Sequence, residues 1–272
     1  MGFFIGESNL ARNVMPNTPE TEYVQLKQSV YREYCRSYDE DRQRFVGGRG
    51  LGERVEWALE GLSPGTRLLD LGCGSGDVLA KALEDNPKGP APVGMDLTPE
   101  MLALARQRLK TSCQLVQANA QVDSSLGLPL QDGSFDLVTS LNLIQELPKE
   151  AIPELLSEIH RVLKPGGRFR TVIPCMVGEN PSSLTFRQLS LERGAMEFLF
   201  PEELEDLLDF NRGDGLVDRE FRLGPSSAAA AAASGETRFR LFAQIMDEIR
   251  DRGLDPRSVT QGVMFFSARK VV

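Results

Sequence analysis

The glycine-rich segment at residues 68–77 is the part of the sequence whose residue types could do chemistry. It reads Leu-Leu-Asp-Leu-Gly-Cys-Gly-Ser-Gly-Asp, so an apolar strand leads into three closely spaced glycines and then into a helical stretch. Such a turn presents backbone N–H groups and a helix N-terminus to a ligand. Gly72, Gly74 and Gly76 follow a G-x-G-x-G spacing, and Asp77 takes the place of the third glycine of the dinucleotide pattern. The segment predicts a ligand-binding loop that is not a standard dinucleotide loop.

The charge beside this loop indicates which ligand it takes. Asp70 stands two residues before the first glycine. An unpaired carboxylate there would repel the diphosphate of NAD or FAD, because like charges in a low-dielectric cleft cost several kcal/mol. A ligand with an ammonium group and no phosphate would be attracted instead. S-adenosylmethionine, which carries an α-ammonium, a sulfonium, one carboxylate and an adenosine, has this character.

A second acid, Asp96, follows the second expected strand. It lies 20 residues after the last glycine of the loop (96 − 76). An acid at about this distance, at the end of the second strand, holds the ribose hydroxyls of a bound nucleoside. The alternative is a turn or helix-cap residue, which is the commoner role of an isolated acid at a strand end.

These residues depend on alternating strands and helices to position them. Apolar patterns predict strands at 67–71, 92–95, 114–117, 135–139 and 168–173, separated by helices at 76–83, 99–109 and 152–163. The last third predicts a helix at 201–210, a strand at 216–223, a helix through 239–249 and a strand at 263–268. Strands separated by helix-length segments favour a parallel sheet that is covered on both faces.

The motifs taken in order resemble a known family. They are Asp70-x-Gly72-x-Gly74, the downstream Asp96, Asn119-Ala120 after the third strand, Phe135-Asp-Leu-Val138 and Leu163-Lys-Pro-Gly-Gly167. This series is similar to the class I S-adenosylmethionine-dependent methyltransferases, in their small-molecule branch that includes ubiquinone/menaquinone-biosynthesis enzymes. The resemblance covers roughly residues 34–175, with a weaker match at 263–270. It implies an α/β, Rossmann-like doubly wound fold: a mostly parallel seven-stranded sheet with helices on both faces, an antiparallel last strand and a helical N-terminal cap.

The resemblance also implies roles for individual residues, with S-adenosylmethionine as cofactor and S-adenosylhomocysteine as product. The loop residues Asp70, Gly72, Cys73 and Gly74 would surround the methionine portion, and Asp96 would hold the ribose. The remaining cofactor contacts would come from Leu97 and Met101 beside the adenine, Asn119 and Ala120 at its edge, Leu141 and Asn142 on the methyl-transfer side, and Tyr38 closing over the cofactor. For Leu97 and Met101 the alternative is ordinary packing, and for Tyr38 it is a surface aromatic on a helix.

The chemistry of methyl transfer makes few demands on catalytic side chains. The sulfonium is an activated donor, so the protein mainly has to place the acceptor in line and exclude water. A base is required only where the acceptor loses a proton, and Glu146 is the candidate. Many relatives have a His-His pair where this sequence has Gln145-Glu146, and the alternative for Glu146 is a carboxylate that complements a helix dipole. We expect His160, the single histidine, to be structural, and we expect no metal site.

The domain organisation follows from the same patterns. We expect residues 1–50 to form an N-terminal arm and helical cap, with the helix over 18–45, and residues 51–272 to form the methyltransferase domain. That domain would contain a lid insertion at about 176–200 and a low-complexity alanine-rich segment at 225–235. The acceptor would lie under the cap helix and residues 176–193, next to aromatic surface from Phe186, Phe198, Phe200 and Phe210.

Composition excludes several classes of protein. The chain has 272 residues, 41% of them hydrophobic and 26% charged, with a net charge of −8, so we expect a globular enzyme that does not bind nucleic acid. Four cysteines without a CxxC pair and the lack of an apolar stretch of ~20 residues predict a cytoplasmic protein with no membrane span. A small-molecule acceptor fits these features, and the oligomeric state stays open. Three alternatives remain: a biosynthetic enzyme that uses the cofactor structurally, such as a cyclase, a non-catalytic partner subunit of this fold, and a nicotinamide-dependent oxidoreductase.

Overall fold

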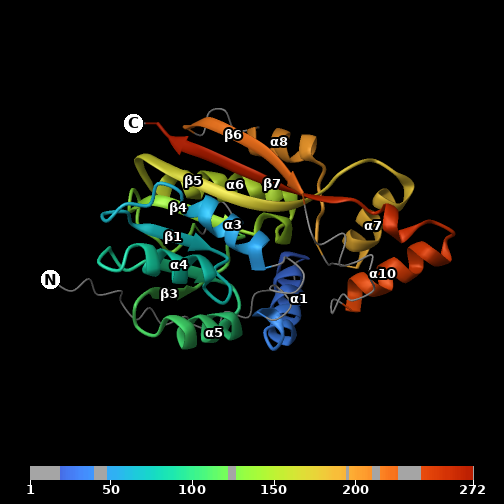
Figure 1. Cartoon of the computed structure of the whole chain (residues 1–272), viewed down its shortest axis with the longest axis horizontal. Helices are drawn as coiled ribbons and strands as arrows, with labels where there is room; N and C mark the ends of the chain where they lie inside the picture. The colour runs from blue at the N-terminus through green and yellow to red at the C-terminus, as the bar shows by residue number, and fades with distance from the viewer. Residues whose placement is uncertain are drawn as a thin grey trace.

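The computed structural model describes residues 19–39, 48–121, 127–193, 196–209, 215–225 and 240–271. The expected N-terminal arm, the end of the expected cap helix, Phe210 and almost all of the alanine-rich segment lie outside these residues. The described chain forms one seven-stranded sheet in the order β3-β2-β1-β4-β5-β7-β6, with helices on both of its faces (Figure 1).

The sheet confirms the predicted fold class. Its strands are β1 (Leu68–Leu71), β2 (Val93–Asp96), β3 (Gln114–Gln117), β4 (Phe135–Leu141), β5 (Leu163–Met176), β6 (Leu216–Pro225) and β7 (Gln261–Lys270). The first five are parallel, and β7 runs antiparallel to both of its neighbours, β5 and β6. In the register of the central strands, Asp70 lies between Gly94 of β2 and Thr139 of β4.

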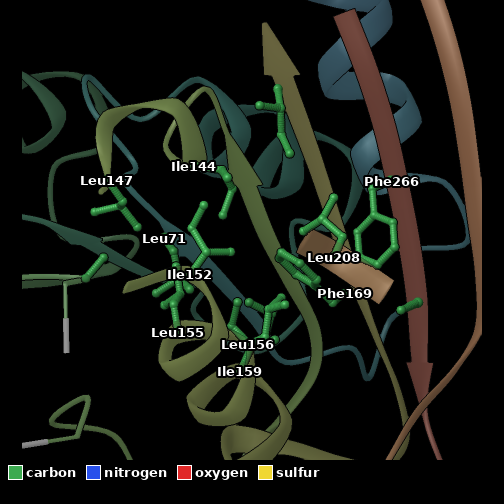
Figure 2. Close-up of a cluster of buried hydrophobic side chains, with 14 of the residues drawn as sticks. Leu71, Ile144, Leu147, Ile152, Leu155, Leu156, Ile159, Phe169, Leu208 and Phe266 are labelled. Atoms are coloured by element: carbon green, nitrogen blue, oxygen red, sulfur yellow. The ribbon is translucent and has the colours of Figure 1, made fainter. Parts of the chain in front are cut away.

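Successive residues of the strands point into two apolar layers, one on each face of the sheet. Leu69, Leu71 and Phe169 face one layer, whereas Leu68 and Leu137 face the other, as the two-residue period of a strand requires. The first layer is covered by α6 (Ile152–Val162) and α8 (Pro201–Asp209), and Figure 2 shows the apolar stripe of α6 pointing at the strands. The second layer is covered by α3 (Gly48–Leu59), α4 (Asp77–Asp85) and α5 (Pro99–Leu109).

Helix α1 (Pro19–Tyr34) lies beside α5, and it is followed by a turn and a short helical stretch at Tyr38 and Asp39. The helix expected over 18–45 is therefore interrupted at residues 35–37. The next described helix, α3, begins at Gly48. The strand expected at 168–173 begins earlier, at Leu163, because Leu163 pairs with Phe135 at an irregular register.

Helices α7 (Pro181–Glu192) and α10 (Arg240–Asp251) lie together beyond the end of β5 and the start of β7 (Figure 1). Their apolar faces meet in a third buried cluster, which includes Phe186, Phe198, Phe200, Ile245 and Ile249. Within the described chain no helix is both long enough and apolar enough to cross a membrane.

Candidate functional site

A cleft opens where β1, β2, β3 and β4 end, on the side that α1 covers. Ligands of doubly wound sheets bind at the carboxyl ends of the strands, where the strand order reverses. The reversal here lies between β1 and β4, because β2 and β3 follow β1 in one direction and β4 and β5 extend the sheet in the other. The cleft therefore lies where the topology of the sheet places a ligand.

The glycine loop forms the floor of the cleft through Gly72 and Gly74. Both residues have positive φ angles, +67° and +53°, which L side chains rarely adopt. A Cβ atom at Gly72 would lie 3.1 Å from Leu143, and one at Gly74 would lie 3.1 Å from the hydroxyl of Tyr38. Glycine is required at both positions, because it allows this backbone conformation and leaves the space above the loop open.

Asp96 connects the loop to the end of β2. Its Oδ2 accepts the N–H of Gly74 at 2.9 Å, and its Oδ1 accepts the N–H of Thr98 at 2.8 Å. Burial raises the pKa of this carboxyl above its usual value, although the hydrogen bonds from Thr98 and Gly74 act in the opposite direction. The side chain lines the cleft, so the structure brings the glycine loop and this acid together as their spacing predicts.

Asp70 and Cys73 are not among the residues that line the cleft, and the cofactor contacts that the resemblance implies for them stay predictions. Asp70 is 2% exposed, lies between two strands and accepts a hydrogen bond from the Thr139 hydroxyl at 2.7 Å. The side chain of Cys73 packs in the core, where a Cβ at Gly94 would lie 2.9 Å from its sulfur. Burial and the charge of Asp70 raise the pKa of the Cys73 thiol, which stays protonated. Both side chains are buried beneath the glycine loop.

The far wall of the cleft contains the remaining cofactor residues expected from the resemblance, namely Leu97, Met101, Asn119 and Ala120. The Asn119 Oδ1 accepts the N–H of Gln121 at 2.9 Å, which shapes the turn after β3. Gln121, which the sequence did not single out, also lines the cleft, and its Oε1 is buried without a hydrogen-bond partner.

The segment after β4 forms the opposite wall. Leu141, Asn142, Leu143, Glu146 and Leu147 line it. Asn142 has a φ of +59°, and its N–H donates to the carbonyl of Val172 at 2.9 Å. A non-glycine residue in this conformation carries backbone strain, and such residues concentrate at functional sites. The Oδ1 of Asn142 is buried without a hydrogen-bond partner.

Helix α1 closes the cleft with residues that the sequence analysis did not assign to a site. Tyr23, Val24, Lys27 and Tyr31 line it beside the expected Tyr38. The Lys27 Nζ donates to Glu146 Oε2 at 2.7 Å, and the Tyr23 hydroxyl donates to the Glu146 carbonyl at 2.7 Å. A signal was present in the sequence, since all four tyrosines of the chain fall between residues 23 and 38 at helical spacing. Their position over the cleft depends on how α1 docks.

The phenylalanines expected above the acceptor lie elsewhere. Phe186, Phe198 and Phe200 are buried in the cluster between α7 and α10, and none of them lines the cleft. The expectation was wrong because these rings find apolar partners on α10, such as Phe242, whose ring centre lies 5.6 Å from that of Phe186. The aromatic surface of the cleft comes from α1 instead.

The polar groups of the cleft fit S-adenosylmethionine. Three buried oxygens on its wall, from Gln121, Asn142 and Glu146, have no hydrogen-bond partner in the described chain, and the wall also carries the carboxylate of Asp96. These groups accept hydrogen bonds, and the ligand carries an amino group, an ammonium and ribose hydroxyls that donate them. No group of three or more His, Cys, Asp or Glu side chains in the described ranges could hold a metal ion.

Comparison with known proteins agrees with this geometry. Residues 68–167 match the family model of a methyltransferase domain. Demethylmenaquinone methyltransferase from Symbiobacterium thermophilum is 28% identical over 243 residues, which cover 79% of this chain and 93% of that protein. Ubiquinone/menaquinone biosynthesis C-methyltransferase UbiE from Dinoroseobacter shibae is 34% identical over 153 residues, but the match covers 55% of this chain and 59% of that protein.

Among solved structures, the chain is similar to phosphoethanolamine N-methyltransferase 2 from Haemonchus contortus, which was solved with phosphomonomethylethanolamine and S-adenosylhomocysteine. The TM-score is 0.69 at 19% identity, and the match covers 95% of this chain and 62% of that one. At this identity the likeness concerns the fold alone.

Proposed function

We propose that this chain, which is a class I S-adenosylmethionine-dependent methyltransferase by its fold and its methyltransferase domain, methylates a small organic acceptor held between α1 and the segment after β4. The observation that carries the proposal is the cleft itself. It joins the glycine loop and Asp96 on one side to an apolar and tyrosine-lined space on the other. One region suits a nucleoside and an amino acid, and the adjoining region suits an acceptor.

On the cofactor side, the residues of this chain bind and orient. When bound, S-adenosylmethionine supplies a methyl group that the sulfonium has already activated. Asp96 holds the ribose hydroxyls, and the N–H groups of the glycine loop approach the methionine portion. Asn119 and Gln121 hold the adenine edge. The assignment is supported by the position of these residues on one cleft wall and by the unpartnered Gln121 oxygen.

On the acceptor side, the residues of this chain exclude water and place the reacting atom. Proximity of that kind accounts for a large part of the rate of a two-substrate reaction. Helix α1 forms the cover, with Tyr23, Lys27 and Tyr31 above the cleft. Glu146 takes a proton from the acceptor where the acceptor has one to lose. This role is supported by its second carboxylate oxygen, which is buried and has no partner in the described chain.

We propose a reduced quinone-type ring as the acceptor. Both relatives described above are named for quinone biosynthesis. The wall formed by Tyr23, Tyr31, Leu143 and Leu147 is apolar and aromatic, as a flat ring requires. Methylation of a ring carbon forms a bond from that carbon to the methyl group and releases the ring proton, which a carboxylate can accept.

The proposal also includes the organisation and location of the protein. Residues 1–50 act as the cap, which is supported by the contacts of α1 with both rims of the cleft: Lys27 with Glu146, and Arg32 Nε with Glu100 Oε1 at 2.8 Å. A cytoplasmic location and an acceptor other than nucleic acid fit the free cysteines and the net charge of −8.

Isothermal titration calorimetry with S-adenosylhomocysteine and, separately, NADH tests the cofactor assignment. We expect S-adenosylhomocysteine to bind in the micromolar range, NADH not to bind, and Asp96→Ala to weaken binding. A second assay measures S-adenosylhomocysteine release with demethylmenaquinol as acceptor. Cofactor binding without product release from any reduced quinone would refute the acceptor, and it would favour a structural use of the cofactor or a partner-subunit role.

A further inference from the structure

Lys27 and Glu146 form a buried charge pair in the wall of the cleft, although 119 residues separate them. Their charged atoms lie 2.7 Å apart, and their side chains are 7% and 9% exposed. Removing two charges from water costs free energy that their attraction often fails to recover, so a buried ion pair is weak evidence of a stabilising role. The pair therefore calls for a functional explanation.

Only one oxygen of this carboxylate is used. Glu146 Oε2 receives the Lys27 ammonium, whereas Oε1 is buried and has no hydrogen-bond partner in the ranges that the structure describes. A buried carboxylate oxygen without a donor is costly. Because Glu146 lines the cleft, a molecule that enters the cleft can supply the missing donor.

The surroundings of this oxygen are aromatic and apolar. The Lys27 Nζ lies 5.2 Å from the centre of the Tyr23 ring, and Tyr31, Leu143 and Leu147 line the same space. Burial, and then the charge of Glu146, raise the pKa of Tyr31 well above its usual value. Hydrogen bonding between Tyr31 and Glu146 also raises this pKa, so the Tyr31 phenol stays neutral and competes with an acceptor for the Glu146 carboxylate.

The charge balance of the cleft disfavours anions. Within the described part of its wall, Lys27 is the one cationic side chain, and it is already paired. Asp96 and Glu146 are both acids on that wall. A phosphate or carboxylate held beside Glu146 would meet its negative charge, and the wall offers no second cationic side chain to bind the anion.

We infer that Lys27 is a positioning residue that holds Glu146 so that its free oxygen receives a hydrogen bond from a hydroxyl or amine of an uncharged aromatic acceptor. The same pair selects against acceptors that carry a phosphate or carboxylate at that position. The inference rests on the proposed function, since it assigns the chemical class of acceptor for the same cleft.

Three matched naphthalene probes separate the effect of a hydrogen-bond donor from the effect of a negative charge. They are 1-naphthol, which has a donor, 1-methoxynaphthalene, which lacks it, and 1-naphthyl phosphate, which is anionic. Calorimetry with saturating S-adenosylhomocysteine measures the binding of each. For the wild-type chain we expect naphthol to bind at least about tenfold more tightly than methoxynaphthalene, because the methyl ether leaves the Glu146 oxygen unpaired. We expect the phosphate to bind more weakly than either.

The variants test each partner. Lys27→Met should reduce the naphthol preference, and Lys27→Arg should restore it, whereas a merely structural role would change the binding of all probes equally. Glu146→Gln should improve binding of the phosphate. The double variant Lys27→Met with Glu146→Leu replaces the buried pair by apolar side chains, a change that is often neutral or stabilising. It should bind naphthol and methoxynaphthalene equally. The control is Lys81→Met, which removes the exposed pair with Asp85, 2.6 Å long and outside the cleft wall.

The outcomes distinguish this inference from the proposed function. If wild type does not bind S-adenosylhomocysteine, the proposed function fails first. If it binds S-adenosylhomocysteine but shows no preference for naphthol over methoxynaphthalene, the inference alone is overturned. If Tyr31→Phe, with the pair intact, abolishes the preference, the donor is recognised by the phenol and the role given to Glu146 is wrong.

Discussion

Replacement of Asp96 by alanine should destabilise the protein and weaken cofactor binding together. The substitution leaves the N–H groups of Gly74 and Thr98 without acceptors in a buried place. Each unsatisfied donor lowers the free energy of unfolding by about 1–3 kcal/mol. Removal of the buried carboxylate charge offsets part of this loss. We expect a net loss of about 2–4 kcal/mol, which lowers Tm by about 4–16 °C at about 2–4 °C per kcal/mol.

The same carboxylate should control the pH dependence of binding. Each charge-assisted hydrogen bond to the ribose contributes about 1.5–3 kcal/mol, so loss of one weakens S-adenosylhomocysteine binding by about 10- to 150-fold. Burial raises the pKa of Asp96 above the ordinary value of 3.8. The acid therefore takes up a proton sooner as pH falls, and wild-type affinity should decline as pH drops through the raised pKa. Asp96→Asn should bind weakly and show no such decline.

Thermal unfolding and calorimetry across pH measure both effects. Asp85→Ala serves as the control, because Asp85 is an exposed acid whose partner is Lys81 on the same helix. If Asp96→Ala unfolds within 1 °C of wild type, on the scale of about 2–4 °C per kcal/mol, and keeps the wild-type affinity, then Asp96 neither holds the loop nor binds the ribose.

Three further substitutions test other parts of the structure. Gly74→Ala should abolish S-adenosylhomocysteine binding in calorimetry, because φ is +53° and the new Cβ would lie 3.1 Å from a tyrosine hydroxyl. Arg170→Met should lower the free energy of unfolding in urea by about 2–4 kcal/mol, because the buried guanidinium donates to two carbonyls of α3 and the turn after it, at 2.7 Å each. Glu158→Gln should lower Tm at neutral pH. The substitution removes the contribution to stability that the ionised Glu158 makes at neutral pH and that the wild type loses when the pH falls. Its pKa is held low by Arg161, so this stability is present above the ordinary carboxyl pKa and disappears as pH falls through the lowered one.

Each of these three substitutions is paired with a control variant or with a result that would contradict the reasoning. Gly65→Ala adds a methyl group to open space and should leave binding unchanged. Arg168→Met removes an exposed arginine from the same strand as Arg170 and should change the free energy of unfolding by less than about 0.5 kcal/mol. Glu158→Gln would contradict the reasoning if its Tm followed the wild-type curve from neutral to acid pH.

The local parts of the fold could be predicted because their signals are local. Gln114–Gln117 and Pro99–Leu109 form the strand and helix expected from their own residues. The glycine loop was recognisable because positive φ angles and a close approach of backbone to ligand restrict the residue type at Gly72 and Gly74. The start of β5 at Leu163 was not predicted, because it depends on pairing with Phe135 of β4, 28 residues earlier in the chain (163 − 135).

Side-chain direction was not predictable to the same degree. The spacing of Asp70 from the glycines predicts a place beside the ligand, but it could not predict that this carboxylate accepts a hydrogen bond from Thr139 across the sheet. Phe186 and Phe198 were expected above the acceptor, but α10 offers them a dry apolar surface. In each case the partner belongs to another element, and no local pattern specifies it.

The sequence by itself determined the α/β fold and the cofactor class, because glycine spacing, a strand-end acid and apolar periodicity act over a few tens of residues. Only the tertiary structure decided the acceptor side of the cleft. Lys27 and Glu146 come together through the docking of α1 on the segment after β4. Such a contact depends on the packing of whole elements, so neither residue's neighbours along the chain could reveal it.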